Sequence, residues 1–239
     1  MRFCGHAFVD WDDTIAENIK YFNMAEEANA QLIARLTATP VDAVRRRGQE
    51  LDLEVARRVG LGKDSLWMAW CECYREFCEL RGQAPDSDTE EAIRRSCRLP
   101  YETRQELHPG AAEALEWLRG RGFEITIWTA GDHDVQSRKV EESGLLPLIH
   151  RLQIVPDKTP ERLAGALGER DPGASFVVGN SIHSDIRPAL ALGLPAFHIP
   201  VETWAYDHGR LDLSDANYHR IASIGELAPA LVQRFRLAV

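Results

Sequence analysis

The stretch His6-Ala7-Phe8-Val9-Asp10-Trp11-Asp12-Asp13-Thr14 decides how this chain is interpreted. Its first four residues form a short run of strand character, and the run ends in a cluster of carboxylates. Because alternate residues of an extended segment share a side, Asp10 and Asp12 are expected to lie close together. Two like charges about 4 Å apart repel by roughly 4 kcal/mol at an effective dielectric constant of about 20, so this pair requires a cation or a shared proton. A plainer interpretation is that Asp12-Asp13-Thr14 turns the chain and caps the next helix.

Four more short runs have the same character as this first predicted strand. They span residues 123–128, 152–155, 175–178 and 196–199, and each is bounded by Gly, Pro, Asp or Asn. Patterns typical of helices separate them, at residues 111–119, 135–143, 159–167 and 186–192. This alternation predicts an α/β fold with a Rossmann-like parallel sheet covered by helices on both faces. Asp10 then stands at the carboxyl end of a strand, where such sheets bind their ligands.

The segment from residue 17 to residue 105 contains no run of strand character and is predicted to be helical. Its first apolar stripe consists of Phe22, Ala25, Ala28, Leu32 and Leu36, and Pro40 ends that helix. Further helical patterns cover residues 51–59 and 66–80, and Asp88 is expected to cap a fourth helix that runs through Cys97. We therefore expect an α/β core made of residues 1–16 and 106–239, with a helical domain, residues 17–105, inserted after the first strand.

Three other predicted strands end in residues that suit a phosphate group or a metal ion. Thr129-Ala130-Gly131 offers a hydroxyl and backbone N–H groups ahead of a helix, although such a tripeptide is more often an ordinary turn. Lys158 is one of four lysines among 28 basic residues, which indicates a need for a compact charge; a surface lysine is the alternative. The segment from Gly179-Asn180 to Asp185 supplies a further carboxylate, which can equally cap a helix.

Taken in order, these four strand ends resemble the motifs of the haloacid dehalogenase-like hydrolase superfamily, most of whose members are phosphatases. Asp10-x-Asp12-x-Thr14 resembles the first motif, Thr129 the second and Lys158 the third, while Gly179-Asn180 through Asp185 resembles the fourth. The resemblance covers the whole α/β portion. The inserted helices look like the α-helical cap of the family, and Leu107-His108-Pro109-Gly110 looks like the return to the core.

The resemblance implies a Mg²⁺-dependent phosphatase that hydrolyses a small phosphorylated metabolite through an aspartyl-phosphate. Asp10 would be the nucleophile and Asp12 the general acid and base, while Trp11 between them packs. Mg²⁺ would be held by Asp10, the backbone carbonyl of Asp12, Asp185 and Asn180. The phosphate would be held by Lys158, by Thr129, and by the backbone N–H groups of Ala130 and Gly131. One residue departs from the family pattern, because Asn180 stands where many members have Asp.

Three other functions remain open at this stage. A phosphomutase would use the same residues, and nothing in the helical segment separates it from a hydrolase. A 2-haloacid dehalogenase would also use Asp10, but it needs neither a metal nor an acid two residues on, so Asp12 and Thr14 favour the phosphatase. A non-catalytic regulatory module is the third alternative, and the presence of all four motif positions argues against it.

Composition limits the partners and the location of the chain. The 239 residues carry a net charge of −9 with no long basic block, which disfavours binding to nucleic acids or anionic membranes. No apolar run approaches the roughly 20 residues that span a bilayer, and the segment before Asp10 is too short for a secretory signal, so we expect a cytoplasmic protein. We expect its partner to be a small phosphate ester, and the chain to be a monomer or a homodimer.

Several residues outside the four motifs are candidates for other roles. Cys71, Cys73 and Cys78 suggest a metal cluster, but the helical spacing of their neighbours favours packing in a core, with Cys73 off the packed face. Arg45-Arg46-Arg47 is either a solvated face or a clamp for the substrate. The aromatic segment 202–208 either packs or borders the entrance to the site.

Overall fold

The computed structural model describes residues 4–60, 62–201 and 214–236, and the chain divides into two compact units. The α/β unit comprises Met1–Glu17 and Arg104–Val239, and the helical unit is Asn18–Thr103. These boundaries lie close to those expected at residues 16 and 106. The aromatic segment 202–208 lies outside the described residues.

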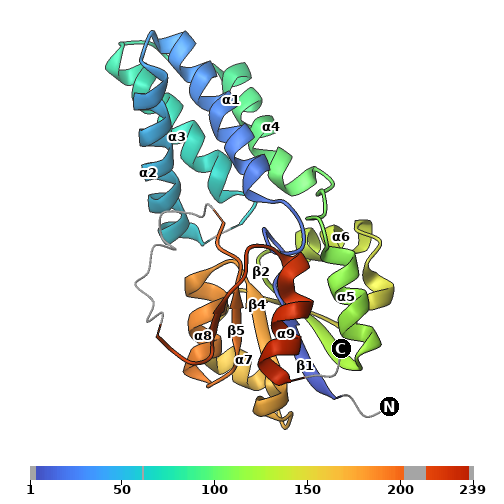
Figure 1. The fold of residues 1–239 in the computed structure, drawn as a ribbon. Coiled ribbons are helices and arrows are strands. Elements are labelled where there is room, and N and C mark those ends of the chain that lie inside the picture. Colours follow the sequence, from blue (N-terminus) through green and yellow to red (C-terminus); the bar gives the residue numbers. More distant parts are fainter. Residues whose placement is uncertain (1–3, 61, 202–213, 237–239) are drawn as a thin grey trace. The chain divides into compact units, whose positions relative to one another are not determined.

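A parallel sheet forms the centre of the α/β unit (Figure 1). Within the described residues it has six strands in the order β3-β2-β1-β4-β5-β6, and each neighbouring pair is parallel. The strands are β1 (Gly5–Val9), β2 (Phe123–Ala130), β3 (Arg151–Val155), β4 (Ser175–Gly179), β5 (Ala196–His198) and β6 (Tyr218–Arg220). The Rossmann-like fold expected from the alternating pattern is therefore confirmed.

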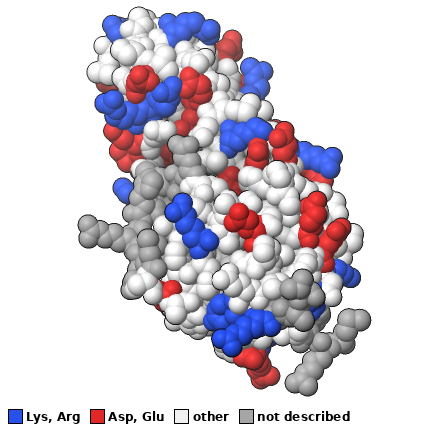
Figure 2. Space-filling model, in the orientation of Figure 1, with Lys and Arg blue, Asp and Glu red and all other residues white. Residues whose placement is uncertain are grey.

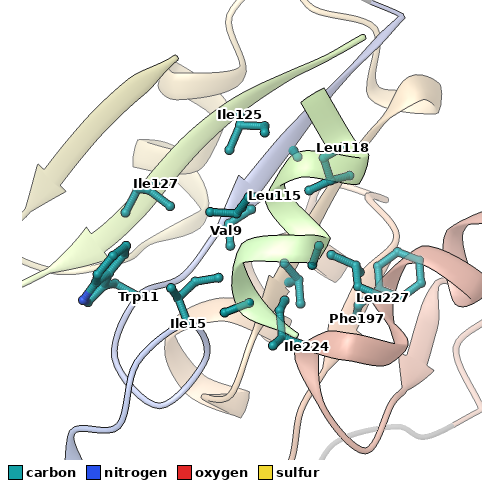
Figure 3. Packing of buried hydrophobic residues seen from close by; sticks show 14 of the residues in the cluster. Val9, Trp11, Ile15, Leu115, Leu118, Ile125, Ile127, Phe197, Ile224 and Leu227 are labelled. Atoms are coloured by element: carbon teal, nitrogen blue, oxygen red, sulfur yellow. The ribbon is translucent and has the colours of Figure 1, made fainter. Parts of the chain in front are cut away.

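Helices cover both faces of this sheet because alternate strand residues point to opposite sides. Ala7 and Val9 of β1 belong to the cluster that includes α5 and α9, whereas Phe8 belongs to the cluster that includes α7 and α8. Figure 3 shows the first of these faces, where Leu115 lies beside Val9 and Leu118 belongs to the same cluster. The helices are α5 (Ala111–Gly120), α6 (His133–Glu142), α7 (Pro160–Leu167), α8 (Arg187–Ala191) and α9 (Leu227–Phe235), with the π-helix η3 (Ile182–Ile186) before α8.

The strand order brings the carboxyl ends of β1 and β4 together. The chain moves from β1 outward through β2 and β3, then returns to β4 on the other side of β1, so β1 and β4 meet at the switch point of the sheet. Val9 pairs with Val178, and the backbone N–H of Asp10 donates to the Val178 carbonyl at 3.0 Å. Residues that follow these two strands are thereby placed side by side.

The helical unit consists of α1 (Ile19–Thr37), α2 (Val41–Val59), α3 (Ser65–Leu80) and α4 (Ser87–Glu102). The apolar stripe expected on α1 is wrong in part, because Ala28 is exposed and Leu36 is 42% exposed. The buried face instead contains Glu26 and Asn29, at 5% and 1% exposure. These polar side chains are buried because they have partners: Gln49 Nε2 donates to Glu26 at 2.9 Å, and Asn29 Nδ2 donates to Cys97 Sγ at 3.1 Å.

Two further details of the helical unit differ from the expectations. Asp86, not Asp88, caps α4, since its carboxylate accepts from the Thr89 backbone N–H at 2.9 Å. Cys73 is fully buried in the same cluster as Cys71 and Cys78, so it is not off the packed face. The structure contains no metal-binding group of three or more His, Cys, Asp or Glu side chains within the residues it describes.

Two arginines of the basic triplet on α2, Arg45 and Arg47, pair with carboxylates of the helical unit itself. Arg45 pairs with Glu27 and Asp42, and Arg47 forms two hydrogen bonds with Glu76, both at 2.8 Å. Figure 2 shows basic and acidic side chains next to one another on the visible surface of this unit. This arrangement supports a solvated, ion-paired face. Among the described residues, no helix is both long enough and apolar enough to cross a membrane.

Candidate active site

Asp10 lies at the centre of the site, at the first position after β1. Its side chain is 6% exposed, and its two oxygens have different partners. Thr14 Oγ1 donates to Oδ2 at 2.8 Å, and Lys158 Nζ donates to Oδ1. The loop reaches back to Asp10 because the N–H groups of Thr14 and Ile15 both donate to the Trp11 carbonyl. Trp11 itself is fully buried and packs in the core, as expected.

Lys158 connects two carboxylates that come from different strand ends. It follows β3, and its ammonium contacts Asp10 and also Asp185 Oδ1, the latter at 2.6 Å. Asp185 is 1% exposed, and its Oδ2 accepts from the Ser181 backbone N–H at 3.0 Å. Burial would lower the pKa of Lys158, but the two carboxylates raise it above its ordinary value, which keeps the ammonium charged.

The charges around Lys158 do not balance. Two carboxylates share one ammonium in a region that water scarcely reaches, so one negative charge remains uncompensated. Burial and the neighbouring Asp185 accordingly raise the pKa of Asp10 to about 7, despite the opposing effect of Lys158. The group as a whole therefore favours an additional positive charge, either a proton or a cation.

Gly179 makes room for the carboxylate of Asp185. A Cβ atom at Gly179 would lie 2.3 Å from Asp185 Cγ and 2.6 Å from Asp185 Cβ, closer than real side chains approach. Glycine at the end of β4 thus lets the loop fold its aspartate back against the strand. The expected cap role is filled by Ser181, whose side chain accepts from the Ser184 N–H at 2.9 Å, while Asp185 points toward Lys158.

Asp12 has a separate set of partners and is more accessible, with 22% of its side chain exposed. Lys139 Nζ and Gln105 Nε2 donate to Oδ1 at 2.8 and 2.9 Å, and Gln136 Nε2 donates to Oδ2 at 2.8 Å. Burial would raise the pKa of Asp12, but the Lys139 ammonium and these hydrogen bonds lower it below its ordinary value. The pKa of Asp10 is thus raised and that of Asp12 is lowered, because their surroundings differ.

The end of β2 agrees only in part with the expectation for a phosphate-binding turn. Thr129 is 1% exposed, and its Oγ1 accepts from Gln136 Nε2 at 3.0 Å. The Gly131 N–H, however, donates to the Val155 carbonyl at 3.0 Å. The expectation that the Gly131 N–H holds the phosphate is therefore wrong, because the pairing of β2 with β3 extends one residue further and uses this N–H group. The Thr129 hydroxyl and the Ala130 backbone remain as candidates.

Asn180 follows Gly179 directly and is partly buried. Its backbone carbonyl is 3.1 Å from His198 Nε2, and His198 Nδ1 is 2.9 Å from the Tyr218 hydroxyl. If Nε2 carries the proton, His198 donates to Asn180 and accepts from Tyr218, which fixes the loop against β5 and β6. His183, inside the same loop, is exposed.

Sequence interpretation missed the three residues that hold Asp12. Gln136 and Lys139 are three apart on α6, so they share a face, and both are buried at 3% and 7% exposure. Gln105 lies where the chain returns from the helical unit. A signal for Lys139 was present, since the scarcity of lysine that singled out Lys158 applies equally to Lys139. Gln105 gives no such signal.

A protein-family model described as haloacid dehalogenase-like hydrolase matches residues 5–193 of the chain, across both units. No curated protein matches it. Among solved structures, a haloacid dehalogenase-like hydrolase from Xanthomonas campestris gives a TM-score of 0.82 at 23% identity, over 99% of this chain and 100% of that one.

Two other similar structures contain different bound groups. The Bacillus subtilis protein YfnB, a hydrolase of this type bound to magnesium, gives a TM-score of 0.60 at 18% identity, over 97% and 99% of the two chains. An L-2-haloacid dehalogenase from Xanthobacter autotrophicus, with chloropropionic acid covalently bound, gives 0.58 at 15% identity, over 96% and 98%. Phosphatases and dehalogenases thus both occur among the similar structures, and at these identities the likeness concerns the fold.

Proposed function

The chain belongs to the haloacid dehalogenase-like hydrolases, and we propose that this hydrolase is a Mg²⁺-dependent phosphatase acting on a small phosphorylated metabolite. One observation carries the proposal. A buried Asp10, oriented by Thr14 and Lys158, has a second, more exposed carboxylate two residues on, and the donors that hold Asp12 differ from those that hold Asp10. This suits a reaction in which one carboxylate attacks and the other moves a proton.

In the first half of the proposed reaction, an oxygen of the Asp10 carboxylate attacks phosphorus. The bond to the leaving oxygen breaks, and that oxygen takes a proton from Asp12. The approach of a phosphate dianion raises the pKa of Asp12 and lets it carry this proton. Lys158 offsets the negative charge that gathers between Asp10 and the phosphoryl oxygens, and the Thr129 hydroxyl and the Ala130 backbone orient those oxygens.

In the second half, water attacks the phosphorus of the aspartyl-phosphate, and Asp12 accepts its proton. The bond between phosphorus and the Asp10 oxygen breaks, so inorganic phosphate leaves and the Asp10 carboxylate is restored. The lowered pKa of Asp12 favours this step, because a base must be ionised.

The donor set of the site fits Mg²⁺. Carboxylate and carbonyl oxygens are the ligands this ion prefers, and the uncompensated charge of Asp10 and Asp185 beside Lys158 favours a cation. Asp10, Asp185, the backbone carbonyl of Asp12 and the side chain of Asn180 would hold it. When bound, the ion offsets the repulsion between a carboxylate nucleophile and an anionic phosphate. We also assign the helical unit the role of the cap that sets substrate specificity.

The test is phosphate release from p-nitrophenyl phosphate. We expect turnover with Mg²⁺ that is lost in EDTA and in Asp10→Asn, both measured on folded protein. Turnover that persists in EDTA contradicts the metal requirement, and turnover by Asp10→Asn contradicts the nucleophile. A screen of phosphorylated sugars, amino acids and nucleotides would then identify the substrate class.

A 2-haloacid dehalogenase is the second candidate, because structures with that activity share this fold. Asp10 would attack carbon in that reaction, and chloride would leave without a metal or an acid. Asp12 would take no part in that reaction, so the hydrogen bonds that hold its carboxylate would not contribute to catalysis. Chloride release from 2-chloropropionate in EDTA, without phosphatase activity, would favour this candidate.

A further inference from the structure

The side chain of Asp12 is held by residues outside the four sequence motifs. An exposed aspartate samples several rotamers, but both oxygens of Asp12 are engaged here. Oδ1 accepts from Lys139 and Gln105, and Oδ2 accepts from Gln136, at distances of 2.8 to 2.9 Å. These donors come from α6 and from the segment that re-enters the α/β unit, so Asp12 is fixed from two directions.

Gln136 also connects Asp12 to the proposed phosphate-binding turn. Its Nε2 lies 2.8 Å from Asp12 Oδ2, 3.0 Å from Thr129 Oγ1 and 2.9 Å from the Ala130 carbonyl. The Asp12 carboxylate and the Ala130 carbonyl can only accept, which determines the orientation of the amide. Because Thr129 Oγ1 accepts from this amide, its own hydroxyl proton can be donated to a phosphate oxygen.

Lys139 supplies the charge that makes this arrangement stable. Its side chain is 6% exposed, and a lysine is seldom buried to this extent without a carboxylate partner. The lysine is three residues after Gln136 on α6, so a single helical face presents both side chains to Asp12.

We infer that Lys139 and Gln136 are positioning residues, which act through Asp12 and Thr129 to set the spacing between the acid–base carboxylate and the phosphate-binding hydroxyl. The inference rests on the proposed function and deepens it. Misplacing a reacting group by about 1 Å can cost on the order of 100-fold in rate, so a contact that fixes Asp12 affects turnover without touching the substrate.

The first experiment compares Lys139→Met with Arg138→Met, a matched loss of one positive charge on the neighbouring residue of α6. Arg138 is 36% exposed and lies 3.8 Å from Glu142, away from Asp12. We expect Lys139→Met to lower kcat for p-nitrophenyl phosphate by about 10- to 100-fold and to change KM little. A positioned acid–base group contributes about 10²- to 10⁴-fold to the rate, and loss of positioning should remove part of that contribution. Arg138→Met should stay within about 2-fold of wild type. Lys139→Arg should recover part of the loss.

A double-mutant cycle separates positioning from a general structural effect. If Lys139 acts through Asp12, then adding Lys139→Met to Asp12→Asn should cost no further activity. Gln136→Ala should differ from Lys139→Met, since it also raises KM and weakens inhibition by inorganic phosphate through Thr129. The inference is overturned if Lys139→Met matches Arg138→Met, or if the effects of Lys139→Met and Asp12→Asn multiply.

Thermal unfolding tests the contact between Lys139 and Asp12 without depending on phosphatase activity. Lys139→Met leaves a carboxylate without its cation and should lower Tm, whereas the double variant with Asp12→Asn should recover much of that loss. A wild-type chain that releases no phosphate refutes the proposed function. Equal Tm values for Lys139→Met and the double variant refute the contact between Lys139 and Asp12, whatever the activity.

Discussion

A methyl group at Gly179 is expected to displace Asp185 from the site. In Gly179→Ala, the new Cβ would lie 2.3 Å from Asp185 Cγ, whereas ordinary contacts begin at 3.4 Å. The carboxylate must therefore move by roughly 1 Å, because the backbone of β4 is held between β1 and β5 and cannot retreat. A shift of this size breaks the 2.6 Å bond to Lys158 and the 3.0 Å bond from the Ser181 N–H.

The cost of this displacement has two parts. Overpacking a close-packed interior costs about 1–3 kcal/mol, and each lost hydrogen bond to a charged group costs about 1.5–3 kcal/mol. We expect the free energy of unfolding of the α/β unit to fall by at least about 4 kcal/mol, the lower end of these costs taken together, and phosphate release to fall by on the order of 100-fold, since a carboxylate of the site is misplaced by about 1 Å.

The assay pairs denaturant unfolding with p-nitrophenyl phosphate turnover, and Gly165→Ala is the control. Gly165 lies on the exposed face of α7, and a Cβ atom there would meet nothing within 4 Å. Alanine at this position should therefore stabilise the helix by about 0.5–1 kcal/mol and leave turnover intact. Adding Asp185→Gly to Gly179→Ala should relieve the clash, because it removes both the Cγ and the Cβ atoms that the new methyl group would meet, so the double variant should be no less stable than Asp185→Gly alone. A Gly179→Ala variant with wild-type stability and turnover would refute the placement of Asp185.

Three further predictions concern charge. Lys158→Met leaves Asp10 and Asp185 without a cation, so the free energy of unfolding should fall by about 3–5 kcal/mol in denaturant titration; an unchanged value would contradict the buried pair. Mg²⁺ should raise the Tm of the wild type by preferential binding to the folded state, and Asp185→Asn should reduce that shift in a differential scan. Burial raises the pKa of Asp52 from 3.8 to about 6, so the folded state binds this proton more tightly and stability should fall as pH rises from about 4 to about 6. Asp52→Asn should remove that dependence and gain on the order of 1–3 kcal/mol at pH 7, measured by unfolding of the chain across this range.

The sheet was predictable because its strands are buried on both faces. Phe123–Trp128 is apolar except for Glu124 and Thr126, and Ser175–Val178 is apolar after its first residue. Gly122 precedes the first run and Gly179 follows the second, so their positions are marked in the sequence. The observed strands differ from the expected ones by one or two residues at an end. The edge strand β6 was missed because Tyr218, His219 and Arg220 are polar and only partly covered, which leaves no apolar signal.

Periodicity predicted the helical unit but not its packed face. The stripe from Phe22 to Leu36 is apolar, yet α1 buries the neighbouring face, which includes Glu26 and Asn29. Hydrophobicity alone ranks these two residues as exposed. Their burial depends on Gln49 and Cys97 from other helices, and no pattern within α1 contains that information.

The motif residues Asp10, Lys158 and Asp185 were predicted because each follows a strand of a parallel sheet, and the topology brings such positions together. The N–H of Gly131 could not be assigned correctly, since its use depends on how far β2 and β3 remain paired. The contacts of Gln105 and Gln136 with Asp12 could not be predicted for a similar reason. Glutamine is a common surface residue, and only the fold brings these two side chains close to Asp12.

Asp10 and Asp12 are each paired with a lysine and not with an arginine. The chain has four lysines, of which Lys20 and Lys63 are exposed, while Lys139 and Lys158 are buried against carboxylates. An ammonium is a compact charge with three donors, so Lys158 can contact Asp10 and Asp185 from one point. The same property lets Lys139 fit beside Gln136 on one face of α6. The two buried lysines thus stand where a small charge fits between groups already in place, Lys158 between Asp10 and Asp185 and Lys139 beside Asp12, and each of the two carboxylates in the proposed reaction has its own cation.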